Sequence, residues 1–308
     1  MSEKLLTIFT TPKPFRDSHI VTIQRNALRS WKALGEEVDV LVIGNDEGVA
    51  ENARALGVRH IPQVKCNSHG TPLISSMLAN AREHSSSPYL AIINTDIILF
   101  PDLLEAIRSI SAFKQQFVLI GQRWDMDVTV ELPGEAEDFA RFKQRVKAKA
   151  KLHPPMGSDY FLFPRSCYET IPDFAIGRAG WDNWFIFNSR FQGWPLVDAT
   201  HDVTIVHQSH DYRHLPGGQP HYRLPETDEN VEQAGGYHTI FTIADAQYDL
   251  VDGKLVKKPL TFKKIAREVE IAPLTRLHSH SLGKLFFYLY NPRKGYQALR
   301  SWLKNLFR

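Results

Sequence analysis

Short apolar runs alternate with helical patterns through the first half of the chain. Residues 4–10, 38–44, 89–94 and 117–121 have the composition of strands, and apolar positions recur at helical spacing between them. Such alternation predicts a parallel sheet wrapped by helices, and the apolar run 89–94 suits a central strand. We therefore expect an α/β fold with a mostly parallel, Rossmann-like sheet.

The expected helices carry start and stop signals. Ser18 precedes the first apolar helical positions, and Gly57 follows the helix expected over 50–56. Thr71, followed by a proline, predicts an N-cap for a helix that runs to about residue 84, and Pro101 opens another. The charged segment 135–151 predicts an exposed helix.

The second half changes character. Residues 153–240 are rich in Gly, Pro, His and aromatic residues, and the strands expected at 160–163, 195–198 and 203–207 are short. Loops held on a rigid scaffold commonly carry binding residues. We expect this half to bind a ligand through loops.

Composition and the first residues bear on the compartment. The 308 residues are 43% hydrophobic and 23% charged, which is ordinary for a globular protein. Cys66 and Cys167 make no disulfide framework, so a reducing compartment is expected. The apolar run near residue 6 is too short for a signal peptide or a membrane span, which favours a cytoplasmic protein.

Charge is distributed unevenly along the chain. Residues 254–308 carry a net charge of +11, and residues 1–253 carry −8. Within 284–308, one helical face combines apolar residues and another combines bases. This pattern predicts a basic amphipathic helical tail. We expect the tail to bind peripherally to an anionic membrane surface on the cytoplasmic side. The alternative is a C-terminal helix that packs on the body of the protein. No nucleic-acid partner is expected.

Several polar residues follow predicted strands. In open α/β sheets, ligands bind at the carboxyl ends of the strands, so Thr10, Thr11, Asp46 and Asp96 are expected in one cleft. Asp96 suits a divalent cation that neutralises a phosphate group. The alternative is that Asp96 caps the helix after Pro101.

Asn94-Thr95-Asp96, after an apolar strand, resembles the Asp-X-Asp motif of GT-A glycosyltransferases. The first position is Asn rather than Asp, which keeps an oxygen ligand. Residues 157–161 resemble the glycine-containing loop that contacts the donor sugar in that fold. Residues 180–184 resemble the segment with the catalytic carboxylate, and 205–210 resemble the strand end that supplies a late histidine.

The resemblance implies a glycosyltransferase domain over residues 1–253 that moves a sugar from a UDP- or GDP-sugar to a glycan or lipid-linked acceptor. It implies Mn²⁺ or Mg²⁺ bound by Asp96 and His207, with His210 as a substitute ligand. The residues expected at the donor are Thr10, Thr11, Asp46, Gly70, Asn94, Thr95, Gly157, Ser158 and Asp159. Asp46 would meet the base and Gly70 the ribose, although Asp46 also suits a plain turn.

Asp182 is the expected general base. Its glycine and aromatic neighbours would exclude water and raise its pKa toward the working range. Attack opposite the departing diphosphate would invert the anomeric centre, while a retaining course stays open. Asp182 also suits a helix cap before Asn183, and both roles are compatible.

The sequence also bears on other classes of protein. The cluster of histidines at 201–221 invites a zinc site, but it lacks paired cysteines. No GxGxxG or GxxxxGK[ST] sequence occurs. A sugar nucleotidyltransferase and a non-catalytic carbohydrate-binding protein remain as alternatives, and Asn94 favours the second.

Overall fold

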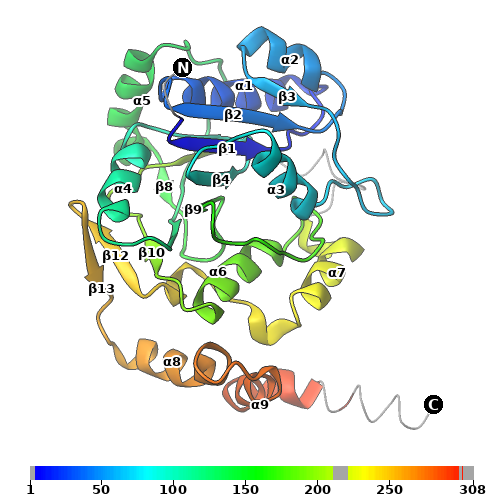
Figure 1. The fold of residues 1–308 in the computed structure, drawn as a ribbon, viewed down its shortest axis with the longest axis vertical. Coiled ribbons are helices and arrows are strands. Elements are labelled where there is room, and N and C mark those ends of the chain that lie inside the picture. Colours follow the sequence, from blue (N-terminus) through cyan, green and yellow to red (C-terminus); the bar gives the residue numbers. More distant parts are fainter. Residues whose placement is uncertain (1–3, 211–220, 298–299, 301–308) are drawn as a thin grey trace.

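A mixed sheet forms the centre of the computed structural model, which describes residues 4–210, 221–297 and 300. Within these residues the sheet has nine strands in the order β13-β12-β10-β6-β9-β4-β1-β2-β3 (Figure 1). Their bounds are β1 Leu6–Thr10, β2 Val38–Ile43, β3 Arg59–Ile61, β4 Tyr89–Ile93, β6 Val118–Ile120, β9 Tyr160–Pro164, β10 Leu196–Asp198, β12 Tyr248–Val251 and β13 Lys254–Lys257.

Most neighbouring strands of this sheet are parallel. Strand β1 pairs in parallel with β2 and β4, β2 with β3, and β10 with β6 and β12. Strand β9 lies antiparallel between β4 and β6, and β13 is antiparallel to β12. The predicted α/β class with a mostly parallel sheet is confirmed.

Helices cover both faces of the large sheet. Apolar residues of α1, α2 and α4 pack on one face, and those of α3 and α6 pack on the other. The described helices are α1 Ser18–Lys32, α2 Val49–Leu56, α3 Ile74–Glu83, α4 Asp102–Ser111, α5 Ala136–Lys149, α6 Trp181–Phe191, α7 Pro225–Gln233, α8 Phe262–Thr275 and α9 His280–Tyr290. The molecule therefore has three layers, with the sheet in the middle.

A smaller sheet lies beside the large one. Its four strands in the described chain follow the order β5-β11-β7-β8, with bounds β5 Ile97–Ile98, β11 Val206–Gln208, β7 Trp124–Met126 and β8 Lys151–Leu152. Phe139, Phe142 and Val146 of α5 are buried against it. Helix α5 was predicted to be exposed, and this prediction is wrong for one face because the small sheet needs an apolar cover.

Two predicted helix caps are wrong and one helix end is confirmed. Asp17, not Ser18, caps α1, because its carboxylate accepts the backbone N–H groups of residues 19 and 20. Thr71 does not cap α3: residues 66 and 73 form β-bridges that keep the chain extended until Ile74. Gly57, at φ 62°, ends α2 as predicted.

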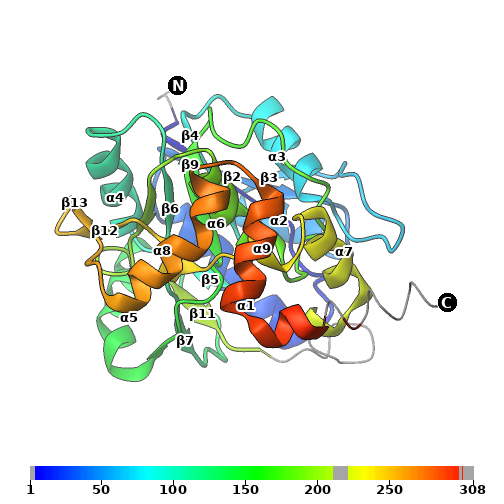
Figure 2. The ribbon, with the colours of Figure 1, turned by 90° about the horizontal axis from the view of Figure 1, so that it is seen from below.

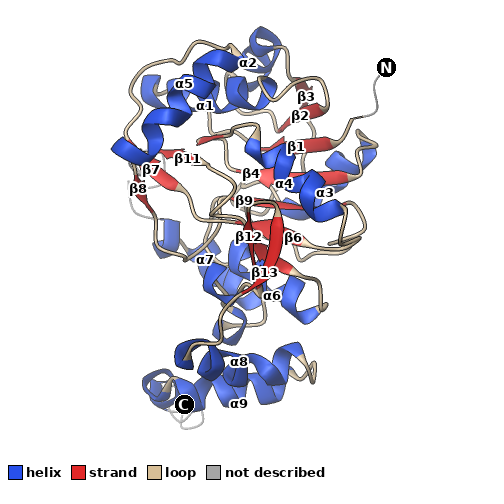
Figure 3. Ribbon diagram, turned by 90° about the vertical axis from the view of Figure 1, so that its left-hand side faces the viewer, coloured by secondary structure: helices blue, strands red, loops and turns tan. Residues whose placement is uncertain are grey.

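The C-terminal segment begins inside the large sheet. The boundary expected after residue 253 falls in the turn between β12 and β13, so the sheet continues past it. Helices α8 and α9 follow as a pair at one end of the molecule (Figures 2 and 3). Arg190 of α6 donates to Glu268 of α8 at 2.8 Å. In the described chain, no helix has the length and apolar character needed to cross a bilayer.

Candidate functional site

The small sheet brings Asp96 and His207 together. Strand β4 ends at Ile93, and the chain passes through Asn94, Thr95 and Asp96 into β5. Strand β11 pairs antiparallel with β5 and places His207 opposite Ile97. The backbone N–H of Gln208 donates to the Asp96 carbonyl at 3.1 Å. Two residues that lie far apart in sequence thus become neighbours.

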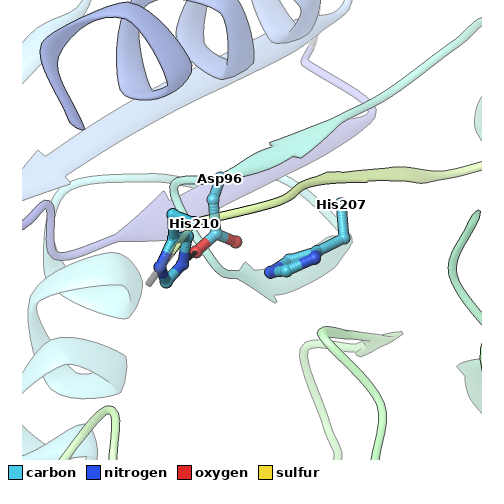
Figure 4. A group of neighbouring side chains, drawn as sticks. All are labelled: Asp96, His207 and His210. Atoms are coloured by element: carbon cyan, nitrogen blue, oxygen red, sulfur yellow. Dashed lines mark hydrogen bonds and ion pairs between the residues drawn. The ribbon is translucent and has the colours of Figure 1, made fainter. Parts of the chain in front are cut away.

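Asp96, His207 and His210 form one cluster of candidate ligands (Figure 4). One carboxylate oxygen and one ring nitrogen from each histidine lie within 4.8 Å of one another. Asp96 is 7% exposed, and its Oδ1 atom has no hydrogen-bond partner among the described residues. An orphaned carboxylate oxygen beside two imidazoles fits a divalent first-row cation.

Lys13 supplies a positive charge to this cluster. Its ammonium lies 3.3 Å from Asp96 Oδ2 and 2.9 Å from His210 Nε2. Burial opposes ionisation of Asp96, but the charge of Lys13 and the hydrogen bond from His210 hold its pKa well below the usual range. Asp96 is therefore an anion across the physiological range. It contacts Lys13 and His210 instead of capping the helix after Pro101.

Asp182 and Gly157 meet at the start of α6. A β-carbon on residue 157 would lie 2.0 Å from Asp182 Oδ2, so only glycine leaves room for the carboxylate. Burial, and then the neighbouring charge of Asp159, raise the pKa of Asp182 to about 6, against opposing backbone hydrogen bonds. Helix α6 begins at Trp181 after Gly180, so Asp182 occupies its first turn. The predicted helix start at Asn183 is wrong by two residues.

Asp159 contacts Asn94 and Arg123, and its charge acts on Asp182. Its oxygens accept hydrogen bonds from Arg123 at 2.8 and 2.9 Å, and Asn94 Nδ2 donates to Oδ1 at 2.9 Å. An aspartate at position 94 would face Asp159 with a second negative charge. The amide at this position, which departs from the Asp-X-Asp pattern, therefore suits its neighbour.

The hydroxyl groups expected at the donor differ in their surroundings. Thr10 and Thr95 hydrogen-bond each other at 2.7 Å, and both are buried. The Thr11 hydroxyl is buried with no partner among the described residues. Ser158 donates to the carbonyl of Tyr160 at 2.8 Å, which is a structural role.

Asp46 and Gly70 lie in exposed segments. Asp46 is close enough to Cys66 to help burial raise the pKa of that thiol. Gly70 has φ 80° in a turn closed by Asn67, with open space around its Cβ position. The turn explains this glycine without a ligand, and the contact to ribose stays a prediction.

Four residues of the site were not foreseen from the sequence, namely Lys13, Arg123, Asp125 and His153. Asp125 accepts Arg123 Nε at 2.9 Å, His153 Nδ1 at 2.7 Å and His207 Nδ1 at 3.1 Å. The available signal was the position of Arg123 and Asp125 soon after an apolar strand. Among the other histidines of the 201–221 cluster, His214 lies outside the described residues, as does the side chain of His221, and His201 contacts Asp202.

No protein-family model matches the chain, and no curated protein matches it. A mannosyltransferase from Pyrobaculum calidifontis, in complex with GDP-Man and Mn²⁺, is 12% identical with a TM-score of 0.39. The match covers 67% of this chain and 57% of that one. Glucosyl-3-phosphoglycerate synthase from Mycobacterium tuberculosis is 14% identical with a TM-score of 0.47, covering 84% and 88%.

The same synthase in complex with Mg²⁺ and UDP is 13% identical, again with a TM-score of 0.47 and coverage of 84% and 88%. The chain therefore spans little more than half the length of the mannosyltransferase but most of the synthase. With identities this low, only the residues of this chain can indicate its activity.

Proposed function

We propose that the chain is a GT-A-type glycosyltransferase that moves a sugar from a UDP- or GDP-sugar to a glycan or lipid-linked acceptor. The convergence of Asp96, His207 and His210 on one point carries this proposal. A bound Mn²⁺ or Mg²⁺ would neutralise the charge of the departing diphosphate. Asp96 and His207 would hold it, with His210 as the third ligand.

Asp182 acts as the general base. A carboxyl group with a pKa of about 6 is ionised at neutral pH and still basic enough to accept a proton in the transition state. It takes the proton of the acceptor hydroxyl while that oxygen bonds to the anomeric carbon. The bond from that carbon to the diphosphate breaks, and the nucleoside diphosphate leaves with the electron pair. Attack from the face opposite the leaving group gives inversion.

The donor is held by residues at the carboxyl ends of the strands. Thr11 offers its unpartnered hydroxyl, and Gly157 opens the loop beside Asp182. The donor site between Thr11 and Gly157 is lined by Asn94, Thr95 and Asp159. Asn94 is hydrogen-bonded to Asp159, and Thr95 is hydrogen-bonded to Thr10. Asp46 and Gly70 are proposed to meet the base and the ribose, and Ser158 holds the backbone of the donor loop.

Product analysis with each donor tests the reaction. Purified protein with UDP- or GDP-sugars and Mn²⁺ is expected to release nucleoside diphosphate, and EDTA is expected to stop the release. Release of pyrophosphate from a sugar phosphate and a nucleoside triphosphate would identify a nucleotidyltransferase instead. Sugar binding with no turnover would identify a carbohydrate-binding protein. Either of the last two results contradicts the proposal.

The C-terminal segment, residues 254–308, is proposed to contact an anionic membrane on the cytoplasmic side. Phe262, Ile265 and Val269 follow one face of α8 and are exposed, with Phe262 88% exposed. Helix α9 presents a second exposed row of leucines, Leu282, Leu285 and Leu289. Rows of this spacing with nearby bases suit an anionic lipid surface.

The acidic residues of this segment are occupied elsewhere. Glu268 pairs with Arg190 and Lys264, and Glu270 pairs with Arg267. The segment has a net charge of +11, so a second copy of it would repel the first, whereas anionic lipid complements it. Leu299, Trp302, Leu303, Lys304, Leu306 and Arg308 of the expected amphipathic helix lie outside the described residues.

A further inference from the structure

Asp125 and His207 form a cross-strand pair. Strands β7 and β11 are parallel neighbours, and their register places Asp125 beside His207. His207 Nδ1 lies 3.1 Å from Asp125 Oδ1. Because strand pairing sets this register, the two side chains meet without depending on a loop conformation.

The carboxylate of Asp125 is itself held in place. His153, which follows β8, donates from Nδ1 to Oδ2 at 2.7 Å, and Arg123 donates from Nε to Oδ1 at 2.9 Å. The Arg123 guanidinium and the Asp125 carboxylate therefore form an ion pair. An ionised carboxylate only accepts, so the proton of His207 is on Nδ1.

We infer that Asp125 is a positioning residue that orients His207 for the cation. With Nδ1–H committed to Asp125, the Nε2 lone pair of His207 is left for the metal beside Asp96. A carboxylate behind a ligating histidine fixes its tautomer and ring orientation and increases its basicity. The inference rests on the proposed cation site and extends it to a residue that does not touch the cation.

Binding of Mn²⁺ without a donor, measured by titration calorimetry or by the EPR signal of free Mn²⁺, tests the inference. Asp125→Asn is expected to weaken binding about 10- to 100-fold. Asp127→Asn is the matched control, because Asp127 is an exposed aspartate two residues after Asp125, immediately beyond the end of β7. It is expected to change binding less than about twofold, since it contacts no ligand. Asp125→Glu, which keeps charge and acceptor, should recover part of the affinity.

A double-mutant cycle separates positioning from a general loss of charge or structure. In a His207→Ala background, Asp125→Asn should add no further loss, whereas in a His210→Ala background it should keep its effect. Equal losses in both backgrounds, or no loss in the wild-type background, would overturn the inference while leaving the cation site intact. Absence of Mn²⁺ binding by the wild type would overturn the cation site itself.

A spectroscopic measurement and a second variant test the positioning role independently. The visible spectrum of bound Co²⁺ should change in Asp125→Asn, because the ring of His207 can turn, and should stay as in the wild type in Asp127→Asn. Asp125→Ser offers a second way to remove the carboxylate where the Asn variant does not fold. An unchanged Co²⁺ spectrum in both Asp125 variants would contradict the positioning role.

Discussion

The carboxylate of Asp182 lies over the backbone of Gly157, so close that a β-carbon at residue 157 would be 2.0 Å from Oδ2. Gly157→Ala must therefore push the carboxylate away. Because the displaced atom is the end of a side chain, the fold should survive, and kcat for sugar transfer is expected to fall about 100-fold through misplacement of the base. Steady-state kinetics and thermal unfolding measure the two effects.

Gly134→Ala is the matched control for this substitution. A β-carbon there makes only ordinary contacts with Arg29, the nearest at 3.8 Å. It should leave kcat unchanged. A Gly157→Ala enzyme with wild-type kcat would show that the position of Asp182 does not matter to the reaction.

The pH profile reports on Asp182. Its pKa of about 6 predicts that kcat/KM rises about tenfold per pH unit below pH 6 and levels off above it, because only the ionised carboxylate accepts a proton. The measurement is made at saturating Mn²⁺ at every pH, so that cation loss does not imitate the effect. Asp182→Asn should have low activity, and its kcat/KM should not rise with pH in this range. A wild-type rate independent of pH between 5 and 8 would remove Asp182 as the base.

Asp182 also links stability to pH. Its folded pKa, raised from 3.8 to about 6, means that the folded state binds a proton more tightly than the unfolded state. Stability is therefore lost as the pH rises from about 4 to 6, and Asp182→Asn should be more stable than the wild type at pH 8 by up to about 3 kcal/mol. The two should match near pH 3.5. Urea unfolding at both pH values measures the difference, and a less stable variant at pH 8 would contradict it.

Lys13 competes with any cation for Asp96 and His210. Lys13→Met removes this charge and keeps the chain length, so Mn²⁺ affinity without a donor is expected to rise roughly tenfold. Lys32→Met is the control, because Lys32 donates to a surface carbonyl of Leu56. Calorimetric titration gives both constants. Weaker Mn²⁺ binding by the Lys13 variant would mean that the ammonium supports the site.

Vesicle binding tests the helices α8 and α9. The double variant Phe262→Ser, Leu285→Ser is expected to lose about tenfold in binding to phosphatidylglycerol vesicles, because it removes apolar area that enters the lipid interface. Phe113→Ser is the matched control, since Phe113 is 65% exposed at the end of α4. Sedimentation with vesicles, at low and high salt, provides the measurement.

Truncation after about residue 280 extends the same test. Loss of α9 and the residues after it should weaken binding to the anionic vesicles more than the double variant does, while neutral phosphatidylcholine vesicles should bind neither form. Unchanged sedimentation of the truncated protein with anionic vesicles would contradict membrane contact.

The large sheet was predictable because its strands are local apolar runs. The strands expected over 4–10, 38–44 and 89–94 correspond to β1, β2 and β4, each within two residues at either end. Helix α2 and its end at Gly57 followed from spacing and from the glycine. The prediction for Thr71 is wrong because a local β-bridge between Cys66 and Pro72 and a distant one between Leu73 and Ala175 compete with its preference for a helix cap.

Most of the small sheet was not predictable from local pattern: among its described strands, only β11 overlaps an expected one, at 203–207. Its strands have only two or three residues, too few to show a period, and each depends on a partner far along the chain. The pairing of Asp125 with His207 follows from that register alone. The sequence could therefore suggest Asp96 and His207 through resemblance, but it could not indicate the carboxylate between His207 and His153.

The pairing of β5 with β11 also brings the two ends of a long chain segment, residues 96–207, together. Asp125, Asp159 and Asp182 all lie between residues 96 and 207, so the chain leaves the first candidate cation ligand, supplies these three carboxylates and returns to the second. The excursion is anchored at both ends by the same two short strands. Strands β6, β9 and β10 of this span belong to the large sheet, so only the loops between its helices and strands can change length while both anchors stay in place.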